Sequence, residues 1–286
     1  MNIPSIVKIT PFAFLALITA SLAQGPLVTA AVGLEDPFGE NPSESGSAFF
    51  GAVDAHVFSL RGNAGVYSTF GLLRLSGEIT SSNDPAALPL TQSFRAEARF
   101  RDSLTINSPG LLGTSGRVTG LYLLDGAIGY SGLLDPLNPN QARGHVDYTS
   151  VLSVNGVSDI IEYRLRDDGT TGGTDILGAP QDFTVDFTFG SPFTVQWSVT
   201  TGGRVPVRVQ GMAYSALNQT ATWQGISEVT DAGGTSVPFT VLAASGTDYS
   251  SPIPEPSVLV LIATALPLVL RRHRTLRIHD RNAHRR

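Results

Sequence analysis

DFTVDFTF, residues 182–189, is the stretch that decides the fold class of this chain. Its apolar residues are Phe183, Val185, Phe187 and Phe189, and aspartate and threonine occupy the positions between them. Successive side chains of a β-strand point to opposite faces, so an apolar residue at every second position predicts a strand with one buried face. Half-buried strands of this kind are typical of antiparallel sheets.

The same period of two recurs along most of the chain. It is found at residues 54–60, 70–80, 93–106, 117–130, 144–154, 159–165, 193–200, 204–217 and 220–229. Pieces rich in Gly, Pro, Asn and Asp separate these stretches, and no long helical period interrupts them. We therefore expect an all-β fold, a single antiparallel β-sandwich or jelly-roll-like domain spanning residues 32–245. Residues 33–47 are expected to form an irregular acidic leader, and residues 246–252 a linker.

The amino terminus has the features of a secretory signal peptide. Lys8 precedes an apolar run at residues 9–22, and small side chains lead up to a cleavage site after Ala23. A second potential site follows Ala31. The run is shorter than the roughly 20 residues that a permanent span requires. We expect residues 1–23 to form a signal helix that signal peptidase removes; a retained membrane helix and a buried core helix are the alternatives.

Charge and cysteine content narrow the function classes. Residues 24–251 hold eleven arginines, no lysine and 22 carboxylates, a formal net charge of −11. So negative a body repels a phosphate backbone, and we expect no nucleic-acid partner for it. The chain contains no cysteine, which excludes disulfides, thiolate metal sites and a cysteine nucleophile.

The carboxyl terminus carries three features in a fixed order. They are Pro254-Glu255-Pro256, an uncharged run at residues 257–270, and the arginines Arg271, Arg272 and Arg274. The uncharged run is about 21 Å long as a helix, which is short for a membrane span. Arginines that follow a span remain on the cytoplasmic side, and so does a lysine before a signal helix. The sequence therefore predicts that both ends lie inside and the acidic body outside.

Residues 253–274 resemble the PEP-CTERM sorting signal of exported bacterial proteins. The resemblance implies processing by exosortase, a membrane protease of Gram-negative bacteria that make extracellular polysaccharide. Pro254, Glu255 and Pro256 would be recognition residues for that protease. This chain differs from the family pattern in continuing beyond the arginines through a basic tail, residues 275–286, for which an anionic-lipid or nucleic-acid patch is the alternative interpretation.

Catalytic constellations are hard to find in the body. Its histidines, His56 and His145, lie far apart in the sequence, and GTSGR (113–117) and GYSGL (129–133) are expected to be turns rather than hydrolase elbows. Asp182 and Asp186 share a strand face but would be about 13 to 14 Å apart, too far for glycosidase chemistry. A cross-strand partner such as Glu97 or Asp102 would be needed to complete such a pair.

Two further sets of residues suggest ligands. Asp167, Asp168 and Asp175 surround glycines in DDGTTGGTD, where Ca²⁺ is the alternative to the solvated turn that we expect, and we expect no other cofactor. Five aromatic residues have the potential to stack on sugar rings, although core positions are the favoured interpretation: Tyr130, Tyr148, Trp197, Tyr214 and Trp223.

These observations together predict an exported, non-enzymatic protein of the cell envelope, cell surface or extracellular matrix. Its precursor is expected to be held in the inner membrane of a Gram-negative-type bacterium by the run at residues 257–270. The expected partners are signal peptidase and exosortase during processing, with extracellular polysaccharide as a further partner. The alternative is a secreted glycoside hydrolase or another carbohydrate-active enzyme whose acids meet only in the fold.

Overall fold

The computed structural model describes residues 25–35, 42–49, 51–59, 61–81, 91–132, 144–166, 172–176, 178–206 and 211–253. The regular structure of these residues consists of fourteen β-strands and contains no helix, so none of them forms a helix able to cross a membrane. The predicted signal helix, the sorting signal from Pro254 onward, the span at residues 257–270 and the basic tail lie outside the described residues.

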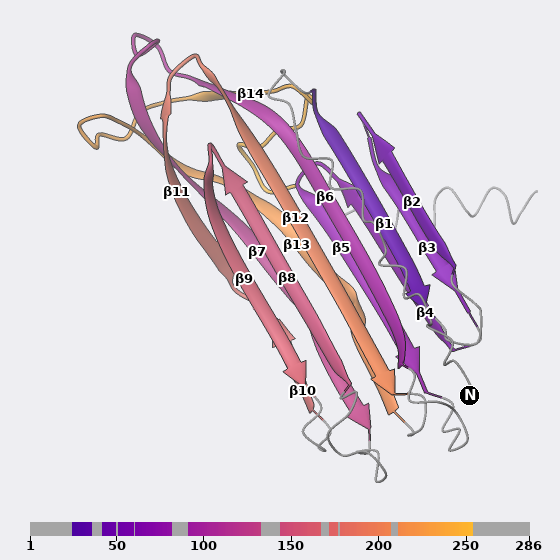
Figure 1. The fold of residues 1–286 in the computed structure, drawn as a ribbon. Coiled ribbons are helices and arrows are strands. Elements are labelled where there is room, and N and C mark those ends of the chain that lie inside the picture. The colour runs from indigo at the N-terminus through magenta and orange to yellow at the C-terminus, as the bar shows by residue number, and fades with distance from the viewer. Residues whose placement is uncertain are drawn as a thin grey trace, which may run out of the picture.

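The strands form two antiparallel sheets that pack face to face (Figure 1). The first, sheet A, has the order β2 (Ser43–Ala48), β1 (Leu27–Glu35), β6 (Thr91–Asn107), β12 (Pro192–Pro206), β8 (His145–Val154) and β9 (Val157–Arg166), with β14 (Thr240–Ala243) also paired to β6.

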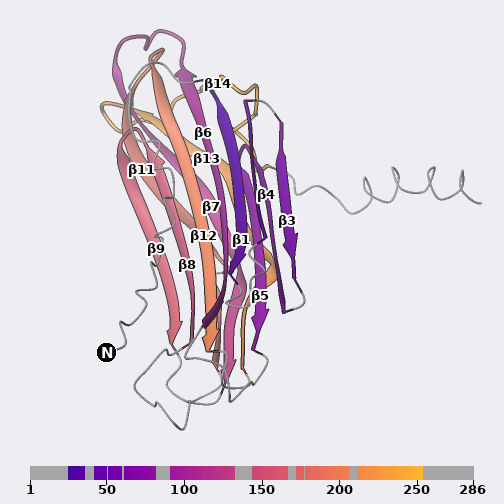
Figure 2. The ribbon, with the colours of Figure 1, turned by 45° about the vertical axis from the view of Figure 1, so that its right-hand side comes forward.

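The second sheet, sheet B, has the order β10 (Gly172–Ile176), β7 (Ser115–Gly132), β13 (Gly211–Asp231), β5 (Leu72–Thr80), β4 (Gly62–Thr69) and β3 (Val53–Phe58). β11 (Pro180–Thr188) also pairs with β7. Figure 2 shows the two sheets as layers of long strands. The predicted all-β fold with two antiparallel sheets is confirmed.

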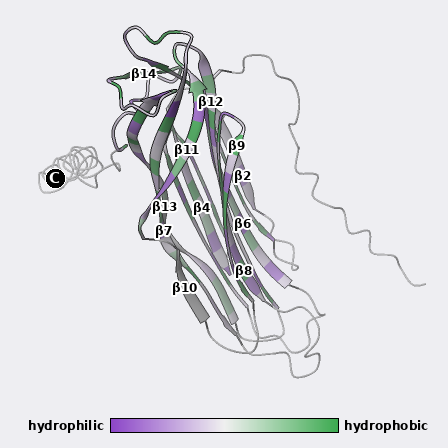
Figure 3. Ribbon diagram, turned by 90° about the vertical axis from the view of Figure 1, so that its left-hand side faces the viewer, coloured by the Kyte–Doolittle hydropathy of each residue, from purple (hydrophilic) through white to green (hydrophobic). Residues whose placement is uncertain are grey.

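The alternation read from the sequence becomes the core. Buried and exposed residues alternate along β1, β6, β8 and β12, and the buried sets of both sheets meet in one apolar core. Figure 3 shows hydrophobic and hydrophilic residues alternating along the strands. DFTVDFTF forms most of β11, and its Val185 and Phe187 are buried as its pattern predicts.

The segment expected to be an irregular leader is partly strand. Residues 33–35 continue β1, which begins at Leu27, and β2 pairs antiparallel with β1. β2 has the sequence SESGSA, whose exposed residues carry no apolar alternation for the sequence analysis to detect. Val28 and Ala30 are buried, so the strand core begins upstream of residue 32.

Residues 246–252, expected to be a linker, instead pack on the body together with their neighbours. We call residues 244–253 the strap. The Tyr249 side chain is fully buried, with its ring 6.3 Å from that of Phe100 in sheet A and 5.4 Å from that of Trp223 in sheet B. Because the strap contacts both layers, it is part of the sandwich.

Two glycines of sheet B make room for the strap. Gly71 and Gly225 have φ angles of 75° and 101°, a region that side chains other than glycine disfavour. A Cβ on Gly71 would lie 2.0 Å from the Ile253 side chain, and one on Gly225 would lie 3.1 Å from the main chain of Ser251. The end of the strap therefore lies directly on the backbone of the sheet.

Candidate functional site

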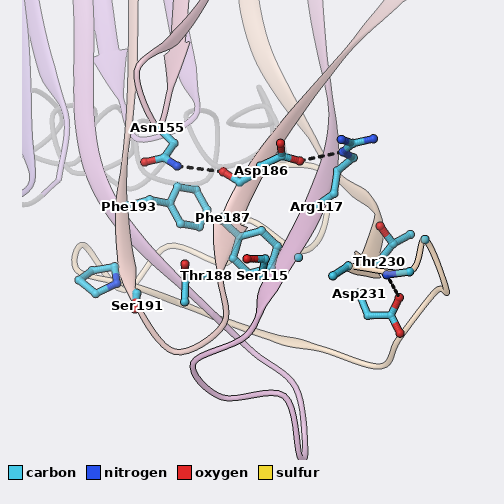
Figure 4. A pocket seen from close by; sticks show the side chains of 15 residues that line it. Ser115, Arg117, Asn155, Asp186, Phe187, Thr188, Ser191, Phe193, Thr230 and Asp231 are labelled. Atoms are coloured by element: carbon cyan, nitrogen blue, oxygen red, sulfur yellow. Dashed lines mark hydrogen bonds and ion pairs between the residues drawn. The ribbon is translucent and has the colours of Figure 1, made fainter.

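A groove of about 750 Å³ opens at one end of the sandwich, where strands of both sheets begin or end (Figure 4). Its walls come from four segments: the start of β7, the β8–β9 turn, the passage from β11 to β12, and the end of β13 with the turn after it. The labelled residues are Ser115, Arg117, Asn155, Asp186, Phe187, Thr188, Ser191, Phe193, Thr230 and Asp231.

Aromatic rings line the apolar part of the groove. Phe187 of β11 lies with its ring 5.8 Å from that of Phe193 in β12 and 4.7 Å from that of Phe189. All three side chains are almost completely buried. The strand pattern that buries Phe187 points its neighbour Asp186 to the opposite, exposed face of β11.

Asp186 and Arg117 form an ion pair on this opposite face. They are paired residues of β11 and β7, and Nε of Arg117 donates to Oδ1 of Asp186 at 2.9 Å. The hydrogen bond and the charge of Asp186 raise the pKa of Arg117. Both side chains are well exposed, at 60% for Arg117 and 75% for Asp186, so water competes for the pair.

Asn155 joins the two sheets at the groove. It adopts a φ of 50° in the two-residue turn between β8 and β9, followed by Gly156 at 82°, as a tight hairpin requires. Its Nδ2 donates to the main-chain oxygen of Asp186 at 2.9 Å, and its main-chain N–H donates to the Thr194 oxygen at 2.8 Å. The turn of sheet A thus fixes the position of β11 in sheet B.

Asp231 stabilises the turn on the far wall. Its Oδ1 accepts hydrogen bonds from the main-chain N–H groups of Gly233 at 2.8 Å and Thr235 at 2.9 Å. DAGG, residues 231–234, is one of the pieces rich in Gly and Asp that are expected to separate the strands. Its place beside Asp186 could not be predicted, because 45 residues of chain separate the two.

The groove combines hydrogen-bond donors and acceptors with apolar rings. Asp186 and Thr230 both pair with Arg117, so Asp186 and Asp231 belong to the two strands that flank β7. Neighbouring strands are about 4.8 Å apart, which puts these main chains about 10 Å from each other. A glycosidase acid normally lies in an apolar pocket, whereas Asp186 is exposed and ion-paired.

The other carboxylates proposed from the sequence are distributed differently. Asp182 and Asp186 share the outer face of β11, as predicted. Glu97 and Asp102 belong to β6 of sheet A, whereas β11 pairs with β7 of sheet B. The suggestion that one of them completes a cross-strand pair with β11 is therefore wrong.

Asp102 has a structural role that the sequence analysis missed. It is 2% exposed, among the buried residues of β6. Its Oδ1 accepts from the main-chain N–H of Ser245 at 3.1 Å, and its Oδ2 accepts from the Ser245 hydroxyl. The buried carboxylate holds the start of the strap.

The histidines lie apart, as expected. His56 is exposed on β3, with Nε2 2.8 Å from Oδ1 of Asp54, and His145 begins β8, with Nε2 3.7 Å from Oδ2 of Asp147. The described residues contain no group of three or more His, Asp or Glu arranged to hold a metal. Asp175 lies in β10, paired with Ala127, while Asp167 and Asp168 are outside the described residues.

The aromatic residues considered for sugar stacking are mostly core. Tyr130, Tyr148, Trp197 and Trp223 are each at most 2% exposed, which confirms the core interpretation for these four. Tyr214 is partly exposed, and its ring covers Gly129 of β7. Of the two glycine-serine pieces expected to be turns, residues 113–114 do form a turn before β7, whereas residues 129–132 continue that strand.

The sorting residues Pro254, Glu255, Pro256, Arg271, Arg272 and Arg274 lie outside the described residues. No protein-family model matches the chain, and a search of curated proteins finds no similar sequence. The fold and the groove define the class of the body as an antiparallel β-sandwich with a polar, aromatic-lined groove at one end.

Proposed function

We propose that this chain is an exported, non-enzymatic protein of the cell surface or extracellular matrix, delivered by an exosortase-type signal at residues 253–274 and associated with extracellular polysaccharide. The observation that carries the proposal is how the residues just before the Pro254-Glu255-Pro256 motif are held on the body. The Ile253 side chain lies against Gly71 of sheet B, and Pro254 of the signal is the next residue.

The contacts of the strap determine which cleavage positions would leave the body intact. The main-chain N–H of Ile253 donates to the Trp223 oxygen at 3.1 Å, and Tyr249 is buried only four residues earlier. Cleavage at or after Pro254 would leave all fourteen described strands and the strap intact. Cleavage several residues earlier would expose the Trp223 and Phe100 rings that contact Tyr249. A signal placed immediately beyond the strap is thus compatible with removal.

The amino-terminal boundary supports export in the same way. Cleavage after Ala23 would leave β1 whole, since β1 begins at Leu27. Cleavage after Ala31 would remove the buried Val28 and Ala30 from the core. We therefore place signal-peptide cleavage at Ala23.

The groove provides a surface for sugar contacts. Arg117 and Asn155 supply donors and Asp186 and Asp231 supply acceptors, which suit the paired hydroxyls of a sugar ring. A polymer bound there has to lack a dense negative charge, because the body carries a formal net charge of −11 over residues 24–251.

The test has two arms, delivery and binding. In the native host, Glu255→Ala is expected to leave an unprocessed, membrane-associated precursor, whereas the matched change Glu228→Ala in the exposed part of β13 is processed normally. In a pull-down on exopolysaccharide from the same cells, the wild type binds and Asp186→Ala binds less. Normal release of Glu255→Ala contradicts the delivery proposal, and equal recovery of wild type with and without polysaccharide contradicts the binding proposal.

One observation favours a glycoside hydrolase as the second candidate: Asp186 and Asp231 lie on strands that flank β7 at the same groove. Release of reducing sugar that disappears in both Asp186→Asn and Asp231→Asn would favour the enzyme. Sugar release unaffected by both variants would reject the groove as its site.

A further inference from the structure

We propose that the free edge of β9 is a self-association surface, at which β9 pairs antiparallel with β9 of a second copy of this chain. Sheet A ends at β9, and no described strand pairs with its outer edge. β9 lies at the margin of the sandwich in both Figure 1 and Figure 2. The inference does not depend on the function proposed above.

β9 carries four charged residues, Asp159, Glu162, Arg164 and Arg166, and Asp159 accepts a hydrogen bond from Tyr122 of sheet B, but β9 contains no proline and its pairing with β8 has no bulge. On the opposite side of the sandwich, Glu44 of β2 accepts the main-chain N–H of His56 in β3 at 2.9 Å, so those two edges are linked. β11 begins with Pro180, and the Asn155 side chain donates a hydrogen bond to the main-chain oxygen of its Asp186. β9 is ten residues long, contains neither proline nor glycine, and exposes 58% of both Val157 and Ile160. Long edge strands with exposed apolar residues pair with other strands.

The hairpin fixes which main-chain groups are free. Val154 and Val157 flank the two-residue turn and therefore form a hydrogen-bonded pair. Bonding direction alternates along an antiparallel strand, so Asp159, Ile161 and Tyr163 also face β8. The N–H and C=O groups of residues 158, 160, 162, 164 and 166 point away from β8 toward the free edge.

Charge then selects the register of the pairing. With Tyr163 on the twofold axis, Glu162 lies opposite Arg164 of the second copy, and Arg164 lies opposite the second Glu162. This register places the free main-chain groups opposite one another, for about eight hydrogen bonds. Moving the axis by one residue in either direction would bring two Glu162 or two Arg164 side chains face to face, which is unfavourable.

In this register the facing side chains are compatible on both faces of the sheet. Arg164 is 57% exposed and 3.8 Å from Asp147 on the outer face. Glu162 is exposed and has no ion-pair partner among the described residues. On the inner face, Ile161 would meet Leu165 and Tyr163 would meet its own copy; all three are partly buried and already pack against the core. Pairing would cover the part of them that remains accessible.

A single introduced thiol tests both the contact and its register, because the chain contains no cysteine. Tyr163→Cys in the full chain is expected to form a disulfide-linked dimer under mild oxidation, since residues facing each other in a non-hydrogen-bonded pair have Cα atoms about 4.5 Å apart. Ile161→Cys, on the same face one pair away, is the matched control and is expected to remain monomeric on a non-reducing gel. Absence of the Tyr163→Cys dimer, or equal dimer from both variants, overturns the proposal.

A charge exchange supplies a second readout that leaves the backbone intact. Glu162→Arg and Arg164→Glu each create two like-charge contacts, and each is expected to weaken self-association of the full chain in mild detergent about tenfold in sedimentation equilibrium. Mixing the two variants restores unlike charges at both positions, so a heterodimer of at least wild-type affinity is expected. Far-UV circular dichroism checks that each variant is folded. A monomeric wild type, or a mixture that associates no better than its components, overturns the proposal.

Discussion

Trp223 of sheet B donates a hydrogen bond from its indole Nε1 to the main-chain oxygen of Tyr249 in the strap, at 2.9 Å and in the buried core. The Tyr249 ring lies nearly perpendicular to the indole, at an interplanar angle of 89°. The indole thus satisfies a carbonyl that burial would otherwise leave without a partner. This contact makes the last ten residues before the proline-glutamate-proline motif a part of the folded body.

The strap is expected to stabilise the sandwich substantially. Tyr249→Ala removes a fully buried ring and should lower the free energy of unfolding by about 3 to 5 kcal/mol. Leu242→Ala is the matched control, because Leu242 is 62% exposed in the neighbouring β14 and its loss should change stability little. Urea unfolding followed by tryptophan fluorescence measures both. Equal stability of the two variants would mean that the strap is a loose linker.

The buried indole of Trp197 depends on one hydroxyl. Its Nε1 donates to Oγ of Ser150 at 2.8 Å, so Ser150→Ala leaves a buried N–H group without an acceptor and should cost about 1 to 3 kcal/mol. Ser153→Ala changes the outer, partly exposed face of the same strand and should be near neutral. Thermal unfolding of the two variants side by side tests this; similar midpoints would contradict it.

Burial raises the pKa of Tyr122, Tyr148 and Tyr249, with a further contribution at Tyr122 from its hydrogen bond to Asp159. These phenols are therefore neutral in the folded state, whereas in the unfolded chain they ionise near pH 10. Their contribution to stability is complete below that pH and is lost as the pH rises above it.

We expect the tyrosinate absorbance of these buried residues to appear together with alkaline unfolding. An absorbance titration at 295 nm, run in parallel with far-UV circular dichroism, follows both events. Tyr148→Phe should reduce the absorbance step that accompanies unfolding. If Tyr148→Phe instead reduces an absorbance step that occurs before the protein unfolds, Tyr148 is not buried.

The amino-terminal boundary can be tested with two truncated chains. A chain that begins at Gln24 retains all of β1, whereas one that begins at Val32 lacks Val28 and Ala30, which are 0% and 3% exposed. We expect the shorter chain to be less stable by at least about 2 kcal/mol, the value of one buried valine side chain. Equal unfolding midpoints of the two chains would mean that cleavage after Ala31 is compatible with the fold.

Local periodicity predicted the long strands of both sheets, but not β1, β2, β4, β10 and β14, and not which strands pair. The alternation in DFTVDFTF identified β11, yet its pairing with β7 depends on contacts between residues about 65 positions apart. β2 escaped prediction because SESGSA has no apolar alternation and is a strand through its pairing with β1. Tyr249 escaped because one aromatic residue among small polar neighbours has no period at all.

The groove could be predicted only in part. The strand pattern predicted the exposed position of Asp186. The Asn155-Gly156 pair is a strong sequence signal for a two-residue hairpin turn. Arg117 gave no signal and Asp231 indicated only a turn, because the two residues come to the same groove only when three strands of sheet B pair. The charge pattern of β9 likewise gains meaning only once that strand is known to be an edge.

We propose that the sandwich is carried across the membrane and separated from both terminal segments. Intact mass spectrometry of the protein recovered from its native cells tests this most directly. We expect a mass that corresponds to a chain beginning at Gln24 and ending between Ile253 and Arg271. The mass of the full chain in the cytosol, or a carboxyl terminus upstream of Tyr249, would contradict it.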